Sequence, residues 1–170
     1  MSQTILIPSN YGCIALLNPK RYTFLREDGI LYTEDLLDDY NSEKIFLWGV
    51  PRGNWKVKID FSVEIPQGFR SLKGCLVSDG ELCFYTYDDL NVFAVGNATS
   101  KMTEMPEEWT LPVKEGRYVC TVVQLYDPQR WDDNSVWNEP LHYHLSLVES
   151  AEQVEPAKDF PWENFSENSM

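Results

Sequence analysis

The chain has 170 residues, of which 43% are apolar and 14% are aromatic, and it carries a net charge of −13. This length suits a single core that needs no metal or disulfide, and the composition excludes a disordered chain. The charge disfavours a nucleic-acid binder, because Lys and Arg contacts to phosphate supply most of the affinity of such proteins. The natural complement of an acidic surface is a basic protein partner.

The termini and the cysteines bear on the compartment. The amino terminus lacks the basic and apolar regions of a signal peptide, and no apolar run approaches the ~18 residues that cross a bilayer. We therefore expect a cytoplasmic protein that does not bind a membrane. The cysteines lie in apolar, strand-like sequence, so we expect free, buried thiols, with a Cys75–Cys83 bridge as the alternative. They are Cys13, Cys75, Cys83 and Cys120.

The first fifty residues predict short strands and one helix. Residues 4–18 and 22–27 read as strands joined by a turn at Asn18-Pro19, which predicts a hairpin. Residues 27–43 hold seven acids and no base, and within them residues 32–40 predict a short helix with Thr33 as its cap. Residues 44–50 predict the next strand.

The clearest alternation of the chain covers residues 54–65 and predicts a strand with one apolar face. That face consists of Trp55, Val57, Ile59, Phe61, Val63 and Ile65. Residues 72–77 and 82–87 flank an Asp79-Gly80 pair, which predicts a second hairpin because both residue types tolerate positive φ. Residues 91–95 predict another strand.

Residues 111–149 form the stretch around which the chain is organised. Residues 117–126 are almost continuously apolar, β-branched or aromatic, which predicts a strand covered on both faces. Residues 141–149 alternate and predict a half-buried strand. If these two strands pair, residues 127–139 between them stand clear of the sheet.

The segment 127–139, here called the acidic loop, carries four acids, one arginine and two tryptophans. Tryptophan beside complementary charge is typical of a protein-binding hot spot. We therefore predict a partner-binding site made of Asp127, Trp131, Asp132, Asp133, Trp137 and Glu139. The alternative is that both tryptophans merely close the end of the core.

The sequence offers little support for catalysis or for a metal centre. His142 and His144 have a spacing that can ligate zinc, but further ligands do not follow at informative offsets, so we expect ordinary exposed strand histidines and no cofactor. Nucleophile and phosphate-binding motifs are missing as well. Adjacent acids such as Asp38-Asp39 are typical of a solvated surface, although a hydrolase could use paired carboxylates. We expect that the protein is not an enzyme.

Residues 1–149 predict a single domain, and residues 150–170 predict an acidic, aromatic-containing tail without regular structure. Three aromatic residues, Phe160, Trp162 and Phe165, are unusual in such a tail. We expect them to pack on the domain, because aromatic side chains bury a large apolar area. The alternative is a linear segment that binds a partner.

One segment resembles a known family. Leu111-Pro-Val-Lys-Glu-Gly-Arg-Tyr118 is similar to the part of the bacterial competence-nuclease inhibitor that leads, through a proline and a glycine–aromatic step, into a late strand. The resemblance covers about residues 108–126 and the general order of strands. The small acidic domain is also similar to bacterial toxin-immunity proteins. Both resemblances imply an inhibitor that occludes the active site of a basic enzyme, without assigning functional residues to this chain.

The succession of short strands predicts an all-β protein, mainly an antiparallel β-sandwich with at most one or two short helices, and an open barrel is the alternative. The predicted function is a non-catalytic inhibitor, an immunity protein that neutralises a basic toxin or nuclease. The alternative function is a β-sandwich module for a small molecule or carbohydrate, with Trp131 and Trp137 as stacking platforms.

Overall fold

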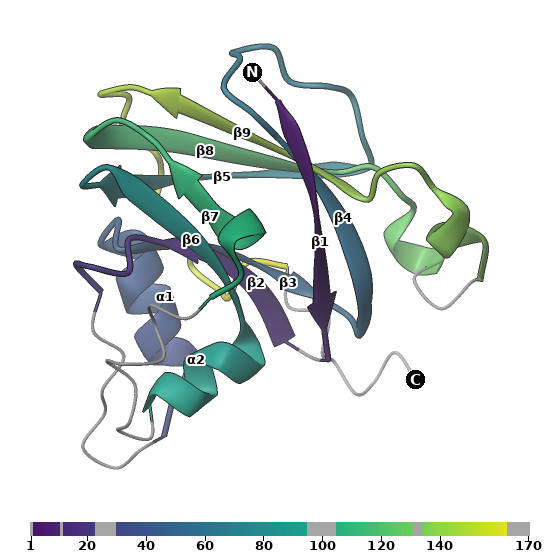
Figure 1. Cartoon of the computed structure of the whole chain (residues 1–170), viewed down its shortest axis with the longest axis horizontal. Helices are drawn as coiled ribbons and strands as arrows, with labels where there is room; N and C mark the ends of the chain where they lie inside the picture. Colours follow the sequence, from purple (N-terminus) through teal and green to yellow (C-terminus); the bar gives the residue numbers. More distant parts are fainter. Residues whose placement is uncertain (1, 11, 23–29, 95–104, 131–133, 163–170) are drawn as a thin grey trace.

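A computed structural model of the chain describes residues 2–10, 12–22, 30–94, 105–130 and 134–162. The described strands form two stacked sheets of five and four strands rather than a closed barrel, as Figure 1 shows. Every strand pair is antiparallel except β4 with β9, which is parallel. The predicted all-β, mainly antiparallel sandwich is therefore confirmed.

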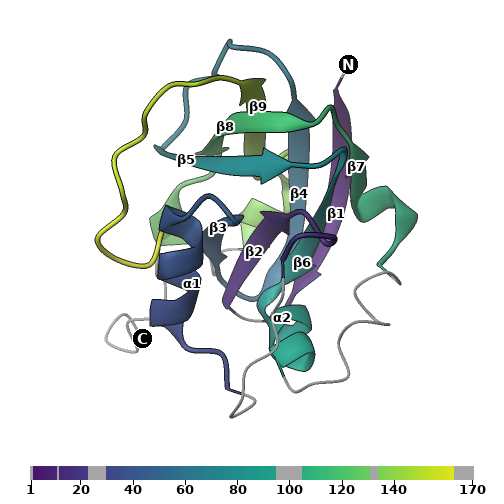
Figure 2. The same ribbon diagram turned by 90° about the vertical axis from the view of Figure 1, so that its left-hand side faces the viewer.

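The elements have the following bounds. The five-stranded sheet has the order β1 (Gln3–Ser9), β4 (Gly53–Asp60), β9 (Tyr143–Glu149), β8 (Gly116–Gln124) and β5 (Arg70–Ser78). The four-stranded sheet has the order β3 (Ile45–Val50), β2 (Gly12–Leu17), β6 (Glu81–Thr86) and β7 (Thr110–Pro112). Helix α1 (Thr33–Asn41) packs against β3 and β5, and helix α2 (Tyr87–Ala94) packs against β2 and β6 (Figure 2). None of the described helices is long and apolar enough to cross a membrane.

The core lies between the two sheets. Strands β2 and β3 are buried along their whole length, whereas β4 alternates and turns Trp55, Val57 and Ile59 inward.

All four cysteines are free and buried, as predicted. Strand β8 lies between β9 and β5, which confirms the interior strand predicted from its apolar sequence. The helix predicted over residues 32–40 is α1, although its capping position is Tyr32 rather than Thr33.

The hairpin predicted around Asp79-Gly80 is wrong. The chain does reverse there, with Gly80 at φ 112°, but the two flanking strands belong to different sheets. Strand β5 pairs with β8, and β6 pairs with β2 and β7. The turn therefore connects the two layers of the sandwich. The prediction failed because a glycine with positive φ allows the chain to reverse but does not determine which strands pair.

The strand predicted over residues 4–18 is divided in two. Strand β1 belongs to the five-stranded sheet and β2 to the other, and Gly12 has φ 104° where β2 begins. The predicted hairpin partner, residues 22–27, lies outside the described residues except for Tyr22. Among the described strands, β2 pairs with β3 and β6.

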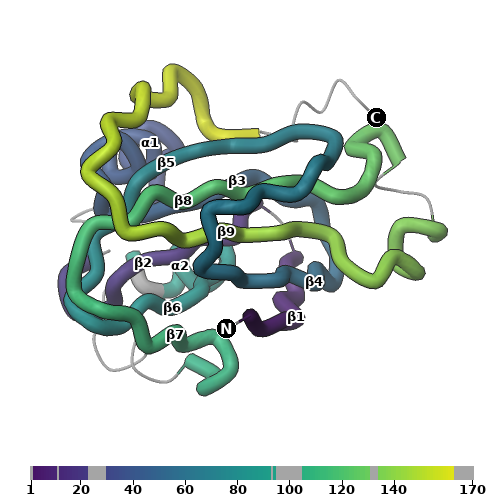
Figure 3. The backbone as a smooth tube through the Cα atoms, turned by 90° about the horizontal axis from the view of Figure 1, so that it is seen from above, coloured from purple at the N-terminus to yellow at the C-terminus, as the bar shows by residue number. Residues whose placement is uncertain are grey.

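Two further predictions are corrected. Residues 91–95 were expected to form a strand, but the described part belongs to α2. The alternation of residues 54–65 continues past the end of β4 at Asp60, and Phe61, Val63 and Ile65 are exposed instead of lying in the core. Figure 3 shows the connection from β4 to β5 passing over the outside of the sheet.

Residues 150–162 lie along the side of the sandwich beside α1 (Figure 2). Asn41 exchanges two hydrogen bonds of 2.9 Å with the backbone of Ala157. The amide of Gly49 on β3 donates to the carbonyl of Pro161 at 2.8 Å, so this segment partly covers the edge of β3. Phe160 and Trp162 pack against the core as predicted, and Phe165 lies outside the described residues.

Candidate partner-binding loop

The acidic loop projects from one end of the five-stranded sheet, on the right of Figure 1. The ladder between β8 and β9 ends at the pair Gln124–Tyr143, so the chain leaves the sheet directly before the loop and rejoins it directly after. Two short 3₁₀ helices, η2 (Pro128–Arg130) and η3 (Asn134–Asn138), shape the excursion. The described part of the loop lies beyond the ladder between β8 and β9, as predicted from the sequence, but it is not clear of the whole sheet, because Trp137 and Glu139 contact β4.

The structure describes three of the six predicted site residues. Trp131, Asp132 and Asp133 lie outside the described residues. Asp127 is half-buried, and its Oδ1 accepts a hydrogen bond of 2.9 Å from the amide of Gln129, which fixes the turn that opens η2. Glu139 is exposed at the other end of the loop.

The third described residue, Trp137, packs on the end of the sandwich core. Its ring centroid is 5.1 Å from that of Trp55 and 5.8 Å from that of His142. The ring also lies against Gly53, where an added Cβ would come within 2.0 Å of it. Trp137 is only half-buried, so part of this residue remains accessible to a partner while its ring packs on Trp55 and Gly53.

His142 joins the loop to the sheet from below. Its Nδ1 accepts a hydrogen bond of 2.9 Å from the amide of Lys56, so its Nε2 carries the proton and donates to the carbonyl of Val136, also at 2.9 Å. The side chain is buried rather than exposed as expected, and burial lowers its pKa. With both nitrogens bonded to the backbone, the ring has no lone pair to offer to a metal.

His144 is also buried, contrary to the expectation of an exposed strand histidine. Its Nε2 lies 3.7 Å from Oδ2 of Asp60, and burial lowers its pKa despite the nearby carboxylate. The two histidines therefore face separate surroundings. Within the part of the chain that the structure describes, no three His, Cys, Asp or Glu side chains gather closely enough to hold a metal ion.

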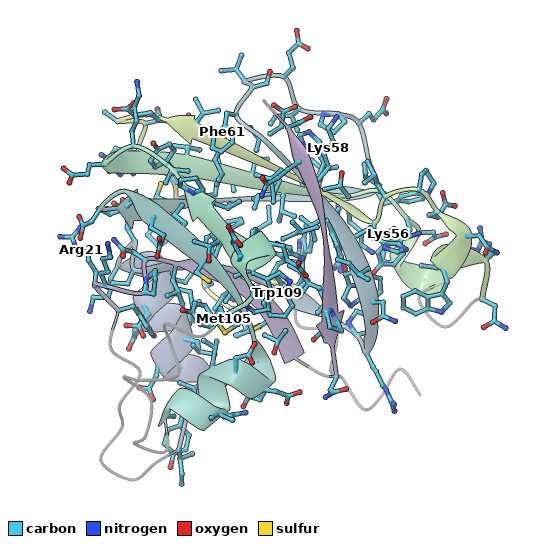
Figure 4. The ribbon with its side chains drawn as sticks, in the orientation of Figure 1. Arg21, Lys56, Lys58, Phe61, Met105 and Trp109 are labelled. Atoms are coloured by element: carbon cyan, nitrogen blue, oxygen red, sulfur yellow. The ribbon has the colours of Figure 1, made fainter. Side chains whose placement is uncertain are left out.

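Lys56 is a functional candidate that sequence reasoning missed. Its amide binds the His142 ring, its carbonyl accepts from the amide of His142 at 3.0 Å, and its Nζ donates to the carbonyl of Glu139 at 3.0 Å. Figure 4 shows Lys56 at the foot of the loop. Since Lys56 and Glu139 are 83 positions apart, the local sequence contains no signal for this contact.

The described parts of the acidic loop, residues 127–130 and 134–139, are joined to each other and to the sheet by hydrogen bonds. Arg130 and Ser135 join its two 3₁₀ helices by a side-chain hydrogen bond, and the amide of Glu139 donates to the carbonyl of Val136 at 3.1 Å. Beneath it, the hydroxyls of Tyr126 and Tyr143 hydrogen-bond to each other at 2.8 Å. Such a surface is suited to recognition by shape and charge.

Comparisons with known proteins identify structural neighbours only. No protein-family model and no curated protein match the chain. The fold is similar to a solved structure described as crocagin biosynthetic gene J, with 15% identity and a TM-score of 0.62 over 88% of this chain and 97% of that one. A second neighbour is ComJ from Bacillus subtilis, an inhibitor of the DNA-degrading activity of NucA, with 10% identity and a TM-score of 0.48 over 88% of this chain and 96% of that one. It is the competence-nuclease inhibitor that residues 111–118 resemble, and at these identities the likeness concerns the fold alone.

Proposed function

We propose that this protein is a non-catalytic inhibitor that neutralises a basic toxin or nuclease in the bacterial cytoplasm. The observation that supports the proposal is the way in which the described part of the acidic loop is held against the sandwich. Lys56 and His142 hold it by backbone hydrogen bonds, and Trp137 anchors it on the core. Residues that are already held in place before binding lose less conformational entropy when a partner docks.

The charge of the loop agrees with a basic partner. An enzyme that acts on nucleic acid collects positive potential around its active site to attract phosphate. An acidic protrusion would be drawn to the same site and would exclude the substrate. The carboxylates would act mainly on the association rate, whereas a tryptophan in the contact would act mainly on dissociation.

Helix α1 is the competing acidic surface. It has acids in its first turn and no base in its last turn, and Glu34 and Asp38 are exposed. It lies at the opposite end of the molecule from the acidic loop (Figure 1). We favour the loop, because tryptophan accompanies its acids and is enriched in binding hot spots.

A carbohydrate-binding module is the other candidate function. It would require a tryptophan that presents a ring face to a sugar. Trp55 and Gly53 already pack against Trp137, which reduces the ring area available for stacking. The locus distinguishes the two functions, because a toxin-like reading frame beside the gene favours inhibition, and a glycan or transport locus favours the module.

The test is inhibition of the adjacent toxin-like enzyme by the purified protein, with binding kinetics at low and high salt. We expect Asp127→Asn/Glu139→Gln to slow association several-fold at low salt and less at high salt, because the lost charges steer the encounter. Asn at position 127 can still accept the hydrogen bond from Gln129. Glu115→Gln, at the far end of β8, is the matched control and should leave association unchanged. Failure of the protein to inhibit, or an equal effect of both variants, would contradict the proposal.

A further inference from the structure

A pocket unrelated to the acidic loop lies on the α1 side of the sandwich. Its walls come from the segment after β2, with Asn18, Arg21 and Tyr22, and from the turn after α1, with residues 42–44. Val77 of β5 completes the lining, and the volume is about 280 Å³. This volume is near the lower end of pockets that hold small ligands, roughly 300 Å³ upwards, so the pocket fits a small molecule.

Asn18 supplies an unused hydrogen-bond donor in this pocket. Its side-chain oxygen Oδ1 accepts a hydrogen bond from the amide of Lys20 at 3.0 Å. Its backbone carbonyl accepts from the amides of Arg21 and Tyr22, so the residue is held in place. The residue is only 2% exposed, and its Nδ2 is buried without a hydrogen-bond partner. Buried donors are ordinarily satisfied, and Nδ2 would gain a partner if an acceptor reached it from the pocket.

Two cationic side chains give the pocket its charge. Arg21 contacts Asp79 through Nε at 3.2 Å, which leaves the rest of its guanidinium fork to receive an anion. Lys44 is exposed and lies 3.9 Å from Asp39, a mostly buried carboxylate that also accepts a hydrogen bond from the Tyr22 hydroxyl. The acid in the lining, Glu43, is neutralised by three hydrogen bonds of 2.8 to 3.0 Å from Arg117.

We infer that this pocket binds a small organic acid through a single carboxylate. One carboxylate oxygen accepts a hydrogen bond from Asn18 Nδ2. The carboxylate also faces the planar guanidinium of Arg21 and the flexible ammonium of Lys44, both of which can donate to it. The pocket adjoins the C-terminal end of α1, where the helix dipole is negative. That field, together with the acidic protein, disfavours a doubly charged phosphate relative to a monocarboxylate. Val77 and the Tyr22 ring can contact a short apolar portion of the ligand.

The test is calorimetry and thermal denaturation of the full-length protein with butyrate, using butyramide and inorganic phosphate as probes at matched ionic strength. We expect saturable binding of butyrate and a rise in melting temperature, at least tenfold weaker binding of phosphate, and no effect of butyramide. Absence of saturable butyrate binding, or stronger binding of phosphate or butyramide, would overturn the inference.

Variants locate the binding. Asn18→Asp keeps the acceptor for Lys20 but replaces the donor by a negative charge, and we expect at least tenfold weaker binding of butyrate. Because a change at a buried position can impair folding, the exposed Arg21→Gln and Lys44→Gln provide a second test, each with several-fold weaker binding. Arg52→Gln, an exposed cation outside the pocket, should bind like the unaltered protein. Equal affinity of Arg21→Gln, Lys44→Gln and Arg52→Gln would assign the binding to nonspecific charge and reject the pocket.

Discussion

At the residue scale, buried titratable groups keep their neutral forms. His142 and His144 both have lowered pKa values because burial disfavours the imidazolium. His142 in addition needs an unprotonated Nδ1 to accept from the amide of Lys56. Protonation of either histidine therefore lowers the stability of the native protein, and the two side chains have different partners.

This dependence predicts a loss of stability in mild acid. An unfolded histidine takes up a proton as the pH falls below about 6.5, whereas the native protein resists this uptake until the pH reaches the lower native pKa. The free energy of unfolding should thus be constant well above pH 6.5 and fall as the pH decreases below about 6.5. Urea denaturation across this range measures it, and His142→Gln should remove part of the slope. A flat profile in the unaltered protein would contradict the assignment.

The buried thiols predict slow modification. Burial raises the pKa of Cys13 to about 12 and raises that of Cys120 as well, so little thiolate forms at neutral pH. We expect four thiols that react slowly with a disulfide reagent in the native protein and rapidly in denaturant. Fewer than four reactive thiols in denaturant without reductant would mean that a disulfide is present.

At the scale of single elements, helix α2 begins at a capping signal in the sequence that the strand prediction for residues 91–95 overlooked. Thr86 precedes the helix, its Oγ1 accepts from the amide of Asp89 at 3.4 Å, and its own amide donates to Asp89 Oδ2 at 2.8 Å. This reciprocal arrangement is a capping box with aspartate in place of glutamate. The Thr-x-x-Asp spacing at residues 86–89 was therefore available in the sequence and predicts a helix start.

Removal of this cap should destabilise the protein measurably. Thr86→Ala leaves the amide of Asp89 without its acceptor and should lower the free energy of unfolding by about 1 kcal/mol. Thr86→Ser keeps the hydroxyl and should retain most of that stability. Urea denaturation of the three proteins compares them, and equal losses in both variants would attribute the effect to the threonine methyl group instead of the cap.

The acidic loop predicts a structural role for Trp137 alongside binding. Trp137→Ala removes the ring that packs on Trp55 and Gly53 and should cost about 2 kcal/mol, less than a fully buried tryptophan, because part of the ring is exposed. Trp137→Phe should recover much of the loss. Thermal denaturation measures stability, and partner affinity of the folded fraction separates the two roles. An unchanged affinity would move the interface elsewhere, to α1 or the tail.

At the scale of the whole molecule, Arg117 ties three distant segments together. Its guanidinium donates to both carboxylate oxygens of Glu43 at 2.8 to 3.0 Å and to the carbonyls of Ser150 and Glu152 at 2.9 and 2.8 Å. Glu43 follows α1 and has φ 62°, an uncommon conformation for a residue with a side chain. The planar fork of arginine satisfies all of these acceptors at once.

Replacement of this fork should release the segment after β9. A lysine at position 117 supplies one ammonium and cannot reach Glu43 and both carbonyls together, so Arg117→Lys should speed amide exchange at Ala157 and lower the melting temperature. The control is Lys73→Gln, which loses only an exposed pair with Glu152, worth about 0–1 kcal/mol. If exchange at Ala157 is equal in both variants, Arg117 does not hold the segment.

The sequence by itself determined the properties that depend on local composition and period. Acidity, buried cysteines, helix α1 and the apolar run of β8 each follow from residues that are close along the chain. The projecting acidic loop follows from two strong strand patterns separated by too many residues for a tight turn. These features require no knowledge of which strand lies beside which.

Only the tertiary structure decided the strand neighbours and the burial of particular faces. Period-two alternation marks a face without naming what covers it, so Phe61, Val63 and Ile65 look like core although the pairing of β4 with β1 ends at Ile59. The histidines of residues 142–144 look exposed, yet the outer face of β9 is covered, with Ser146 Oγ donating to the carbonyl of Ser62 at 2.6 Å. Pairing and burial depend on contacts between segments far apart in the chain, and a local pattern carries no information about those contacts.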